Sequence, residues 1–175
     1  IIPIFCNPDG KNINAQCGSQ HPERLARVVV EKRADLGLAF DGDGDRLIAV
    51  DEKGHVLSGD QIMAILAQDY LQKGLLKNSR VVATVMSNMG FRAALQQLNI
   101  ELHTTQVGDR YVMEKMLEKD AILGGEDSGH MIFRDVHTTG DGILAALRLL
   151  GALQRAGKPL SQLAKVMTLF PQKLI

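Results

Sequence analysis

The sequence predicts an α/β fold with a mixed, largely parallel sheet flanked by helices. Short apolar runs of strand length alternate with segments of helical spacing along most of the chain, and this alternation is typical of parallel sheets with helical crossovers. The hydrophobic content of 45% over 175 residues is enough for a packed core. No internal repeat interrupts the pattern.

The first predicted elements are a helix, a strand and a hairpin. Residues 21–34 have helical spacing, and Pro22 suits the first turn of a helix. Residues 36–40 form a short apolar run, typical of a buried strand. Residues 46–57 predict a hairpin whose turn lies at 51–54.

A helix, a strand and a second helix are expected next. The helix spans 59–74, with Asp60 as its expected N-cap and Gly74 as its stop. A strand is predicted over 80–86, and a helix follows over 90–98.

The remaining elements continue the alternation. Residues 100–105 predict a strand and residues 109–120 a helix. Two further strands are expected at 121–123 and 131–135. The strongest helical pattern covers 140–159.

The pattern restarts after the hairpin, which predicts two parts. We expect residues 1–57 to be the C-terminal part of one domain and residues 58–170 to be a fuller α/β domain. Residues 171–175 are expected to be a linker towards a further domain. The chain also opens on an apolar run without methionine, so it is expected to belong to a longer polypeptide.

Composition excludes several classes of partner. Twenty basic and twenty acidic residues cancel, so no net field would attract nucleic acid or an anionic membrane. No apolar run approaches the roughly 18–20 residues that cross a bilayer, and the first residues lack the features of a signal peptide. Cys6 and Cys17 are too few for a disulfide framework. We therefore expect a cytoplasmic protein.

Residues 39–50, AFDGDGDRLIAV, contain three crowded carboxylates at Asp41, Asp43 and Asp45. Their mutual repulsion would raise their pKa values unless a positive charge lies between them. Oxygen ligands suit a hard divalent cation, and the intervening glycines allow the loop to curl around it. The cluster predicts a Mg²⁺ site.

There are three alternatives to a magnesium site. An acidic surface turn without function is one. An EF-hand is another, because Glu52 falls at position 12 counted from Asp41, but position 6 is Arg46 where that motif needs glycine. The third is a phosphatase with an aspartyl nucleophile, which stays open.

Arg46 distinguishes phosphoryl chemistry from simple cation binding. A guanidinium presents a rigid fork to phosphate oxygens while a metal neutralises another oxygen. Arg46 beside the three aspartates therefore indicates phosphoryl transfer, with Arg46 as a catalytic residue.

A second polar loop, GGEDSGH, spans residues 124–130. Its carboxylate and hydroxyl can bond vicinal sugar hydroxyls, although a plain polar turn has the same composition. FDGDGDR resembles the metal-binding loop of the α-D-phosphohexomutases, and GGEDSGH resembles their sugar-binding loop. These enzymes interconvert sugar 1-phosphates and 6-phosphates through a phosphoserine. The resemblance implies that Glu126, Ser128 and His130 serve substrate binding, with His130 holding the loop in place.

A third loop, QVGDRYV at residues 106–112, is similar to the family's loop that closes near the reacting phosphate. The resemblance implies a catalytic role for Asp109 and substrate contacts from Gly108 and Arg110. A helix cap at Asp109 is the alternative. This loop, together with residues 12–19 and 58–63, resembles the branch that acts on glucosamine phosphate; glucose or mannose phosphate is the alternative substrate.

The resemblance implies a three-layer α/β/α architecture and an enzyme with Mg²⁺ as its cofactor. Such enzymes have four domains, so the chain would hold the end of the second and the whole third. The phosphoserine would lie upstream, outside this chain; Ser19 is rejected because its surrounding order, SQHP, does not match the family's serine loop. The partners expected are a phosphosugar and the missing domains of the same polypeptide, and the isolated chain is expected to be inactive.

Overall fold

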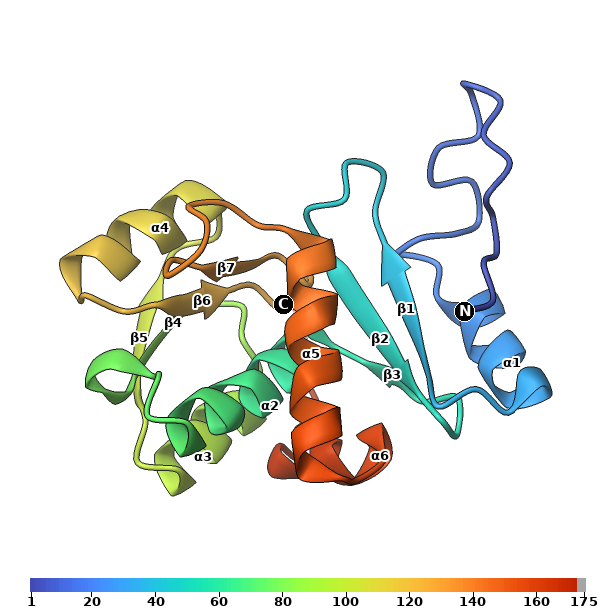
Figure 1. Cartoon of the computed structure of the whole chain (residues 1–175). Helices are drawn as coiled ribbons and strands as arrows, with labels where there is room; N and C mark the ends of the chain where they lie inside the picture. The colour runs from blue at the N-terminus through green and yellow to red at the C-terminus, as the bar shows by residue number, and fades with distance from the viewer. Residues whose placement is uncertain (173–175) are drawn as a thin grey trace.

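Two β-sheets stand side by side in the computed structural model, which describes residues 1–172 (Figure 1). The first sheet contains β1 (Leu36–Phe40), β2 (Leu47–Asp51) and β3 (Val56–Leu57) in that order, all antiparallel. Phe40 pairs with Leu47 across β1 and β2. The six residues between them form one tight connection at the end of the hairpin.

The second sheet has the order β5-β4-β6-β7. Its strands are β4 (Arg80–Thr84), β5 (Glu101–Thr105), β6 (Leu123–Gly125) and β7 (Met131–Phe133). The first three run parallel and β7 is antiparallel to β6. The prediction of a mixed, largely parallel sheet is confirmed for this sheet, whereas the first sheet is wholly antiparallel.

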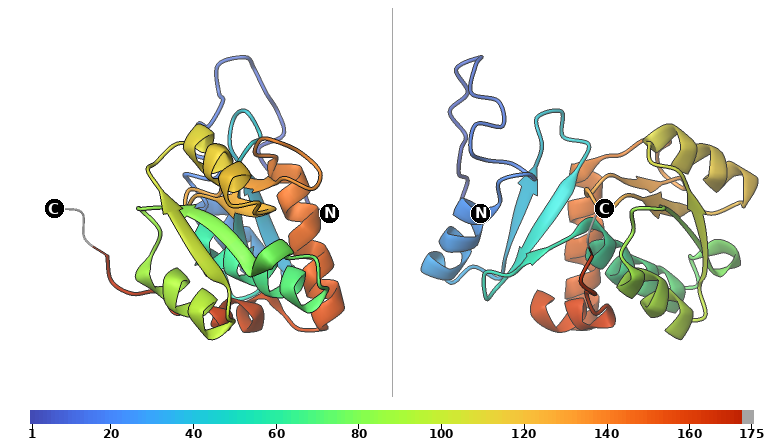
Figure 2. Two further views of the ribbon diagram at one scale, coloured as in Figure 1. Left: turned by 90° about the vertical axis from the view of Figure 1, so that its left-hand side faces the viewer. Right: turned by 180° about the vertical axis from the view of Figure 1, so that it is seen from behind.

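Helices cover both faces of the second sheet (Figures 1 and 2). On one face α4 packs through Val112 and Met116 against Val82 and Ile132. The opposite face packs against α2 and α3, and α5 joins α2 to the first sheet. This gives the three-layer arrangement expected from the resemblance. The helices are α1 (Glu23–Lys32), α2 (Gly59–Gln72), α3 (Met89–Gln97), α4 (Asp109–Glu118), α5 (Gly142–Ala156) and α6 (Leu160–Leu163).

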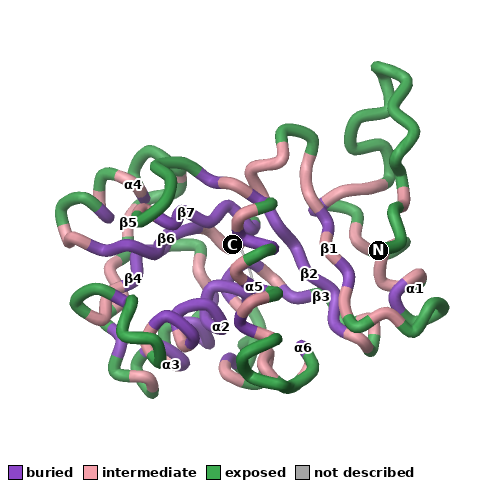
Figure 3. Tube along the Cα trace, viewed as in Figure 1, coloured by how far each residue is buried: buried purple, intermediate pink, exposed green. Residues whose placement is uncertain are grey.

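Helix α2 is the centre of the larger core, and Figure 3 shows it buried along most of its length. A helix that is apolar on most sides is stable only when other elements surround it. Its one strongly paired acid, Asp69, binds Arg155 of α5 through two hydrogen bonds of 2.8 Å. The N-terminal segment before α1, by contrast, is mostly exposed and forms no regular element.

The predicted elements are present, with some differences at their ends. Asp60 is not the N-cap of α2: that position is Ser58, whose N–H donates to Gln61 at 3.2 Å. The strand predicted over 131–135 ends at Phe133. The strand predicted over 121–123 lies instead at Leu123–Gly125, so the first two residues of the predicted 124–130 loop belong to β6. The predicted linker, 171–175, lies partly outside the described residues. None of the described helices is both long enough and apolar enough to span a membrane.

Candidate active site

The three predicted metal ligands come together in the connection between β1 and β2. Asp41, Asp43 and Asp45 each place a carboxylate oxygen within 4.8 Å of the others. Gly44 has a φ of +77°, a conformation that side chains rarely adopt, and it allows the loop to turn back. The N–H of Arg46 donates to Oδ1 of Asp41 at 3.1 Å and closes the loop.

Arg46 lies beside two of these carboxylates. Its Nε is 3.5 Å from Oδ2 of Asp41 and 3.9 Å from Oδ1 of Asp45. Within residues 1–172, Nε of Arg46 and Oδ1 of Asp45 are both buried without a hydrogen-bond partner. Three carboxylates and one guanidinium leave a net charge of about −2, which matches a divalent cation. The donor set and the unpaired Asp45 oxygen therefore fit Mg²⁺.

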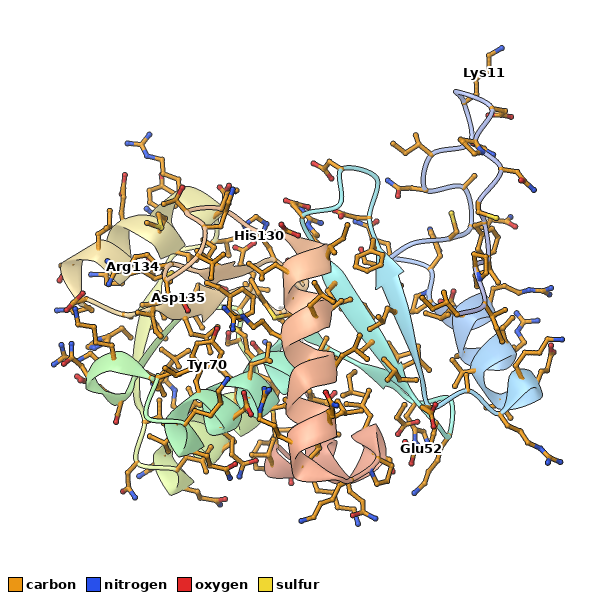
Figure 4. All side chains as sticks on the ribbon, viewed as in Figure 1. Lys11, Glu52, Tyr70, His130, Arg134 and Asp135 are labelled. Atoms are coloured by element: carbon orange, nitrogen blue, oxygen red, sulfur yellow. The ribbon has the colours of Figure 1, made fainter. Side chains whose placement is uncertain are left out.

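His130 connects the aspartate loop to the 124–130 loop. Its buried ring places Nδ1 2.9 Å from Oδ2 of Asp45. The backbones are joined as well, because the N–H of Leu47 donates to the carbonyl of Gly129 at 3.0 Å. Figure 4 shows His130 at the junction of the two sheets, beside the start of α5. Two loops 85 residues apart thus form one site.

The first turn of α5 supports the aspartate loop from behind. The N–H of Gly142 donates to the carbonyl of Gly44 at 2.9 Å. A Cβ atom at Gly142 would lie 2.6 Å from the carbonyl oxygen of Arg46, so only glycine allows this approach. Asp141 caps the helix by accepting the N–H of Leu144 at 2.9 Å. The predicted start of this helix near Asp141 is confirmed.

The 124–130 loop also holds the loop that precedes α4. Oε1 of Glu126 accepts the N–H of Gly108 at 2.9 Å. Gly108 has a φ of 128° and occupies the N-cap position of α4. Glu126 and Gly108 are therefore adjacent, and the exposed Ser128 lies two residues beyond Glu126.

Asp109 and Arg110 form hydrogen bonds within the first turns of α4. Asp109 accepts the N–H of Arg110 at 2.7 Å, and Nε of Arg110 donates to Glu114 at 2.8 Å on the helix surface. The Glu114 carboxylate raises the pKa of the Arg110 guanidinium. Within residues 1–172 no hydrogen bond or ion pair joins either residue to the aspartate loop. The structure brings together the other predicted residues but leaves these two at the periphery.

Two supporting residues were not predicted for the site. Gly140 packs so closely against the His130 ring that a Cβ atom there would overlap the ring. Asp60 is fully buried and contacts the 124–130 loop through its backbone, with its N–H 3.3 Å from Oδ1 of Asp127. Residues 58–63 contain Asp60, but nothing in their spacing indicates that long-range contact.

Both parts of the chain match one protein family. Residues 58–170 match the phosphoglucomutase/phosphomannomutase alpha/beta/alpha domain III, and residues 1–54 match domain II of the same family. The chain is 58% identical over 174 residues to a phosphoglucosamine mutase of Carboxydothermus hydrogenoformans, covering 99% of this chain and 39% of that protein. A phosphoglucosamine mutase of Shouchella clausii is 59% identical over 175 residues, again with 39% of its length covered.

Solved structures share the fold. A phosphoglucomutase/phosphomannomutase family protein of Burkholderia thailandensis has a TM-score of 0.80 at 29% identity, covering 94% of this chain and 36% of that one. An N-acetylphosphoglucosamine mutase of Aspergillus fumigatus, solved with GlcNAc-6P and magnesium, has a TM-score of 0.71 at 20% identity over 94% of this chain and 42% of that one. The chain spans about two fifths of the length of the curated relatives. From its sequence and its fold, the chain belongs to the phosphoglucomutase/phosphomannomutase family.

Proposed function

We propose that this chain is the metal-binding and sugar-binding part of a phosphoglucosamine mutase, which interconverts glucosamine 6-phosphate and glucosamine 1-phosphate. The observation that carries the proposal is the 2.9 Å contact between His130 and Asp45, which joins the aspartate loop to the 124–130 loop. A phosphoryl group at the first loop and sugar hydroxyls at the second would then belong to one bound molecule. The names of the curated relatives support the choice of sugar.

Asp41, Asp43 and Asp45 would hold Mg²⁺, which supplies Lewis-acid neutralisation of phosphoryl oxygens when it is bound. Arg46 would bond a phosphoryl oxygen and stabilise the charge that develops during transfer. Its side chain is 36% exposed, so the guanidinium can reach such an oxygen. Arg46 is therefore the residue of this chain that we assign to the transfer itself.

Glu126 and Ser128 would bond the sugar hydroxyls, since a carboxylate accepts and a hydroxyl both donates and accepts. Gly108, Asp109 and Arg110 would approach the substrate at the edge of this site. His130 would act by positioning Asp45 and its own loop. In the full-length enzyme, a phosphoserine outside this chain would give its phosphoryl group to one sugar oxygen and receive the other phosphate back.

The boundaries proposed for this part of the enzyme are residues 1–57 and 58–170. The rest of the same polypeptide is its expected partner and would supply the phosphoserine. We assign the enzyme to the cytoplasm, which agrees with two cysteines that form no disulfide.

A phosphatase with Asp41 as its nucleophile is less well supported. Both oxygens of Asp41 are already engaged, Oδ1 by the N–H of Arg46 and Oδ2 by its side chain. A nucleophilic oxygen would have to give up one of these contacts before attack.

The test is an assay of the full-length polypeptide on glucosamine 6-phosphate, glucose 6-phosphate and mannose 6-phosphate, with Mg²⁺ or with EDTA. We expect the highest kcat/KM on the glucosamine substrate and loss of activity in EDTA. Asp43→Asn should lower activity at least about a hundredfold, while Asp35→Asn, on the exposed turn before β1, should not. Phosphate release without isomerisation would favour the phosphatase, and a preference for mannose or glucose phosphate would overturn the assignment of substrate.

A further inference from the structure

The first turn of α2 is packed directly against the 124–130 loop. The N–H of Gly59 donates to the carbonyl of Asp127 at 2.9 Å, and the N–H of Asp60 lies 3.3 Å from Oδ1 of the same residue. A Cβ atom at Gly59 would overlap the carbonyl oxygen of Glu126. The backbone of this turn therefore fixes the position of the 124–130 loop relative to α2.

The side chain of Asp60 points to a different segment, the turn that follows β4. Its Oδ2 accepts the N–H of Asn88 at 2.6 Å, and its Oδ1 accepts the hydroxyl of Ser87 at 3.0 Å. Asp60 is fully buried, so this carboxylate has no access to water as a substitute partner. Removing it would leave a buried N–H at Asn88 unpaired.

Asn88 in turn holds the C-terminal segment, residues 168–172. Its Oδ1 accepts the N–H of Phe170 at 3.0 Å, and its Nδ2 donates to the carbonyl of Phe170 at 2.9 Å. Gln172 adds a bond of 3.0 Å to the carbonyl of Met86. This segment is thus bound to the turn after β4 through both the N–H and the carbonyl of one residue.

We infer that Asp60 is a positioning residue that keeps the 124–130 loop and the C-terminal segment in one fixed arrangement. The inference rests on the proposed function, because it assigns the 124–130 loop to sugar binding. The backbone N–H of Asp60 contacts Asp127, while its side chain contacts Asn88, which in turn binds Phe170. A change in the Asp60 side chain therefore reaches the 124–130 loop through a shift of the first turn of α2. A carboxylate suits the central place since two donors converge on it and it offers only acceptors.

An asparagine at position 60 has the same shape but only one acceptor oxygen. Its oxygen would accept the N–H of Asn88 while its amide nitrogen donates to the hydroxyl oxygen of Ser87, so two charge-assisted hydrogen bonds would become weaker neutral ones. In the full-length polypeptide we expect Asp60→Asn to raise the KM for glucosamine 6-phosphate about tenfold while kcat changes less than about twofold. A displaced sugar loop weakens binding without removing Arg46 or the metal ligands.

Asp69→Asn is the matched control. Asp69 is a second buried acid on the same helix, but its partner is Arg155. If Asp60 serves only to stabilise the fold, then Asp60→Asn, like Asp69→Asn, would reduce the fraction of folded protein. Both variants would then lower the apparent kcat, and neither would change KM. That result would overturn the inference.

Hydrogen exchange of the full-length polypeptide provides a readout that does not need activity. In Asp60→Asn the amides of Asn88 and Phe170 should exchange at least about tenfold faster than in wild type, with no such change in Asp69→Asn. If the wild type has no mutase activity, the proposed function fails while the exchange experiment still tests the contacts. Unchanged exchange at both amides would overturn the inference.

Should Asp60→Asn fail to fold, Asn88→Ser tests the same connection. Serine remains a good N-cap for Gly90 but is too short to hold Phe170. We expect faster exchange at Phe170 and a KM raised about threefold. A KM within the error of the wild type would contradict the coupling between this segment and the sugar loop.

Discussion

The Nδ1 atom of His130 lies 2.9 Å from Oδ2 of Asp45, and this contact joins two loops that the chain supplies from different sheets. When a histidine forms a hydrogen bond to a carboxylate that binds a metal, it fixes the orientation of the carboxylate oxygens toward the metal. The backbone of Gly140 packs so closely against the His130 ring that no Cβ atom fits between them. His130 therefore affects the proposed metal site without contributing a ligand.

The first prediction concerns this contact. His130→Ala should weaken Mg²⁺ or Mn²⁺ binding about tenfold, because Asp45 loses the partner that orients it. Isothermal titration calorimetry measures the affinity, and His103→Ala on β5 is the control. An affinity within about twofold of wild type for His130→Ala would show that Asp45 is oriented by its own loop.

The second prediction concerns Gly142→Ala. Alanine inside a helix usually stabilises a protein by about 1 kcal/mol over glycine. Here the new Cβ would lie 2.6 Å from the carbonyl of Arg46 and 2.9 Å from that of Gly44, so overpacking should reduce the free energy of unfolding by about 1–3 kcal/mol. Metal affinity should fall as well, since the aspartate loop must move.

Gly151→Ala is the control for that experiment. Gly151 lies on the same helix, and a Cβ atom placed there would have the flexible end of Arg155 as its nearest neighbour, at 3.0 Å. Urea denaturation should give a stability for Gly151→Ala within about 1 kcal/mol of wild type and an unchanged metal affinity. Equal losses in the two variants would mean that the contact of α5 with the aspartate loop is unimportant.

The aspartate loop was predictable from the sequence because its signal is local. Asp41, Asp43 and Asp45 are separated by single glycines, and the adjacent Arg46 limits the chemistry that they can serve. The strand and helix periodicities were local too, so the order of elements followed from them. That a separate antiparallel sheet carries the loop was not predicted, since strand pairing depends on contacts distant in sequence.

The contacts of Asp60 could not be predicted for the same reason. An acid at the start of an apolar helical run is typical of an N-cap, and local spacing cannot distinguish it from a buried acid in the first turn. Its partners Ser87, Asn88 and Asp127 come from other elements. The importance of Gly140 could not be predicted either, because it depends on the close approach of the His130 ring, ten residues earlier in the chain.

The third prediction concerns pH. Burial, and then the negative charge of Asp127, raise the pKa of Asp60 from its ordinary value of 3.8 to about 6, against the opposing hydrogen bonds from Asn88 and Ser87. A folded protein that binds this proton more tightly than the unfolded chain loses stability as pH rises between about 4 and 6. The loss amounts to at most about 3 kcal/mol and is nearly complete once the pH has passed through the folded-state pKa.

Asp60→Asn has no such titration, so it isolates this contribution. The stability of wild type relative to Asp60→Asn should decrease from about pH 4 to about pH 6 and level off from about pH 7 to about pH 8. Urea denaturation at each pH measures this difference, in which the other carboxylates cancel. A difference that is constant across the whole range would show that the pKa of Asp60 is not raised.

The fourth prediction separates two roles of Glu126. Its Oε1 holds the N–H of Gly108, and its negative charge is proposed to bond sugar hydroxyls. Glu126→Gln keeps an acceptor oxygen at that place, so the Gly108 amide should exchange at a rate within about threefold of wild type. Glu126→Ala removes the acceptor, and exchange at Gly108 should be at least about tenfold faster, in line with the loss of one hydrogen bond to a charged group.

Steady-state kinetics of the full-length polypeptide distinguish the two roles of Glu126. Both Glu126 variants should raise the KM for glucosamine 6-phosphate, and Glu126→Ala should raise it more because it also releases the Gly108 loop. Glu118→Gln, at the exposed C-terminal end of α4, removes ion pairs to Lys115 and Lys119 and serves as the control with unchanged KM and Gly108 exchange. If Glu126→Gln has a wild-type KM while Glu126→Ala does not, then Glu126 acts by holding Gly108 in place, and the sugar hydroxyls must be bonded by other residues of the loop.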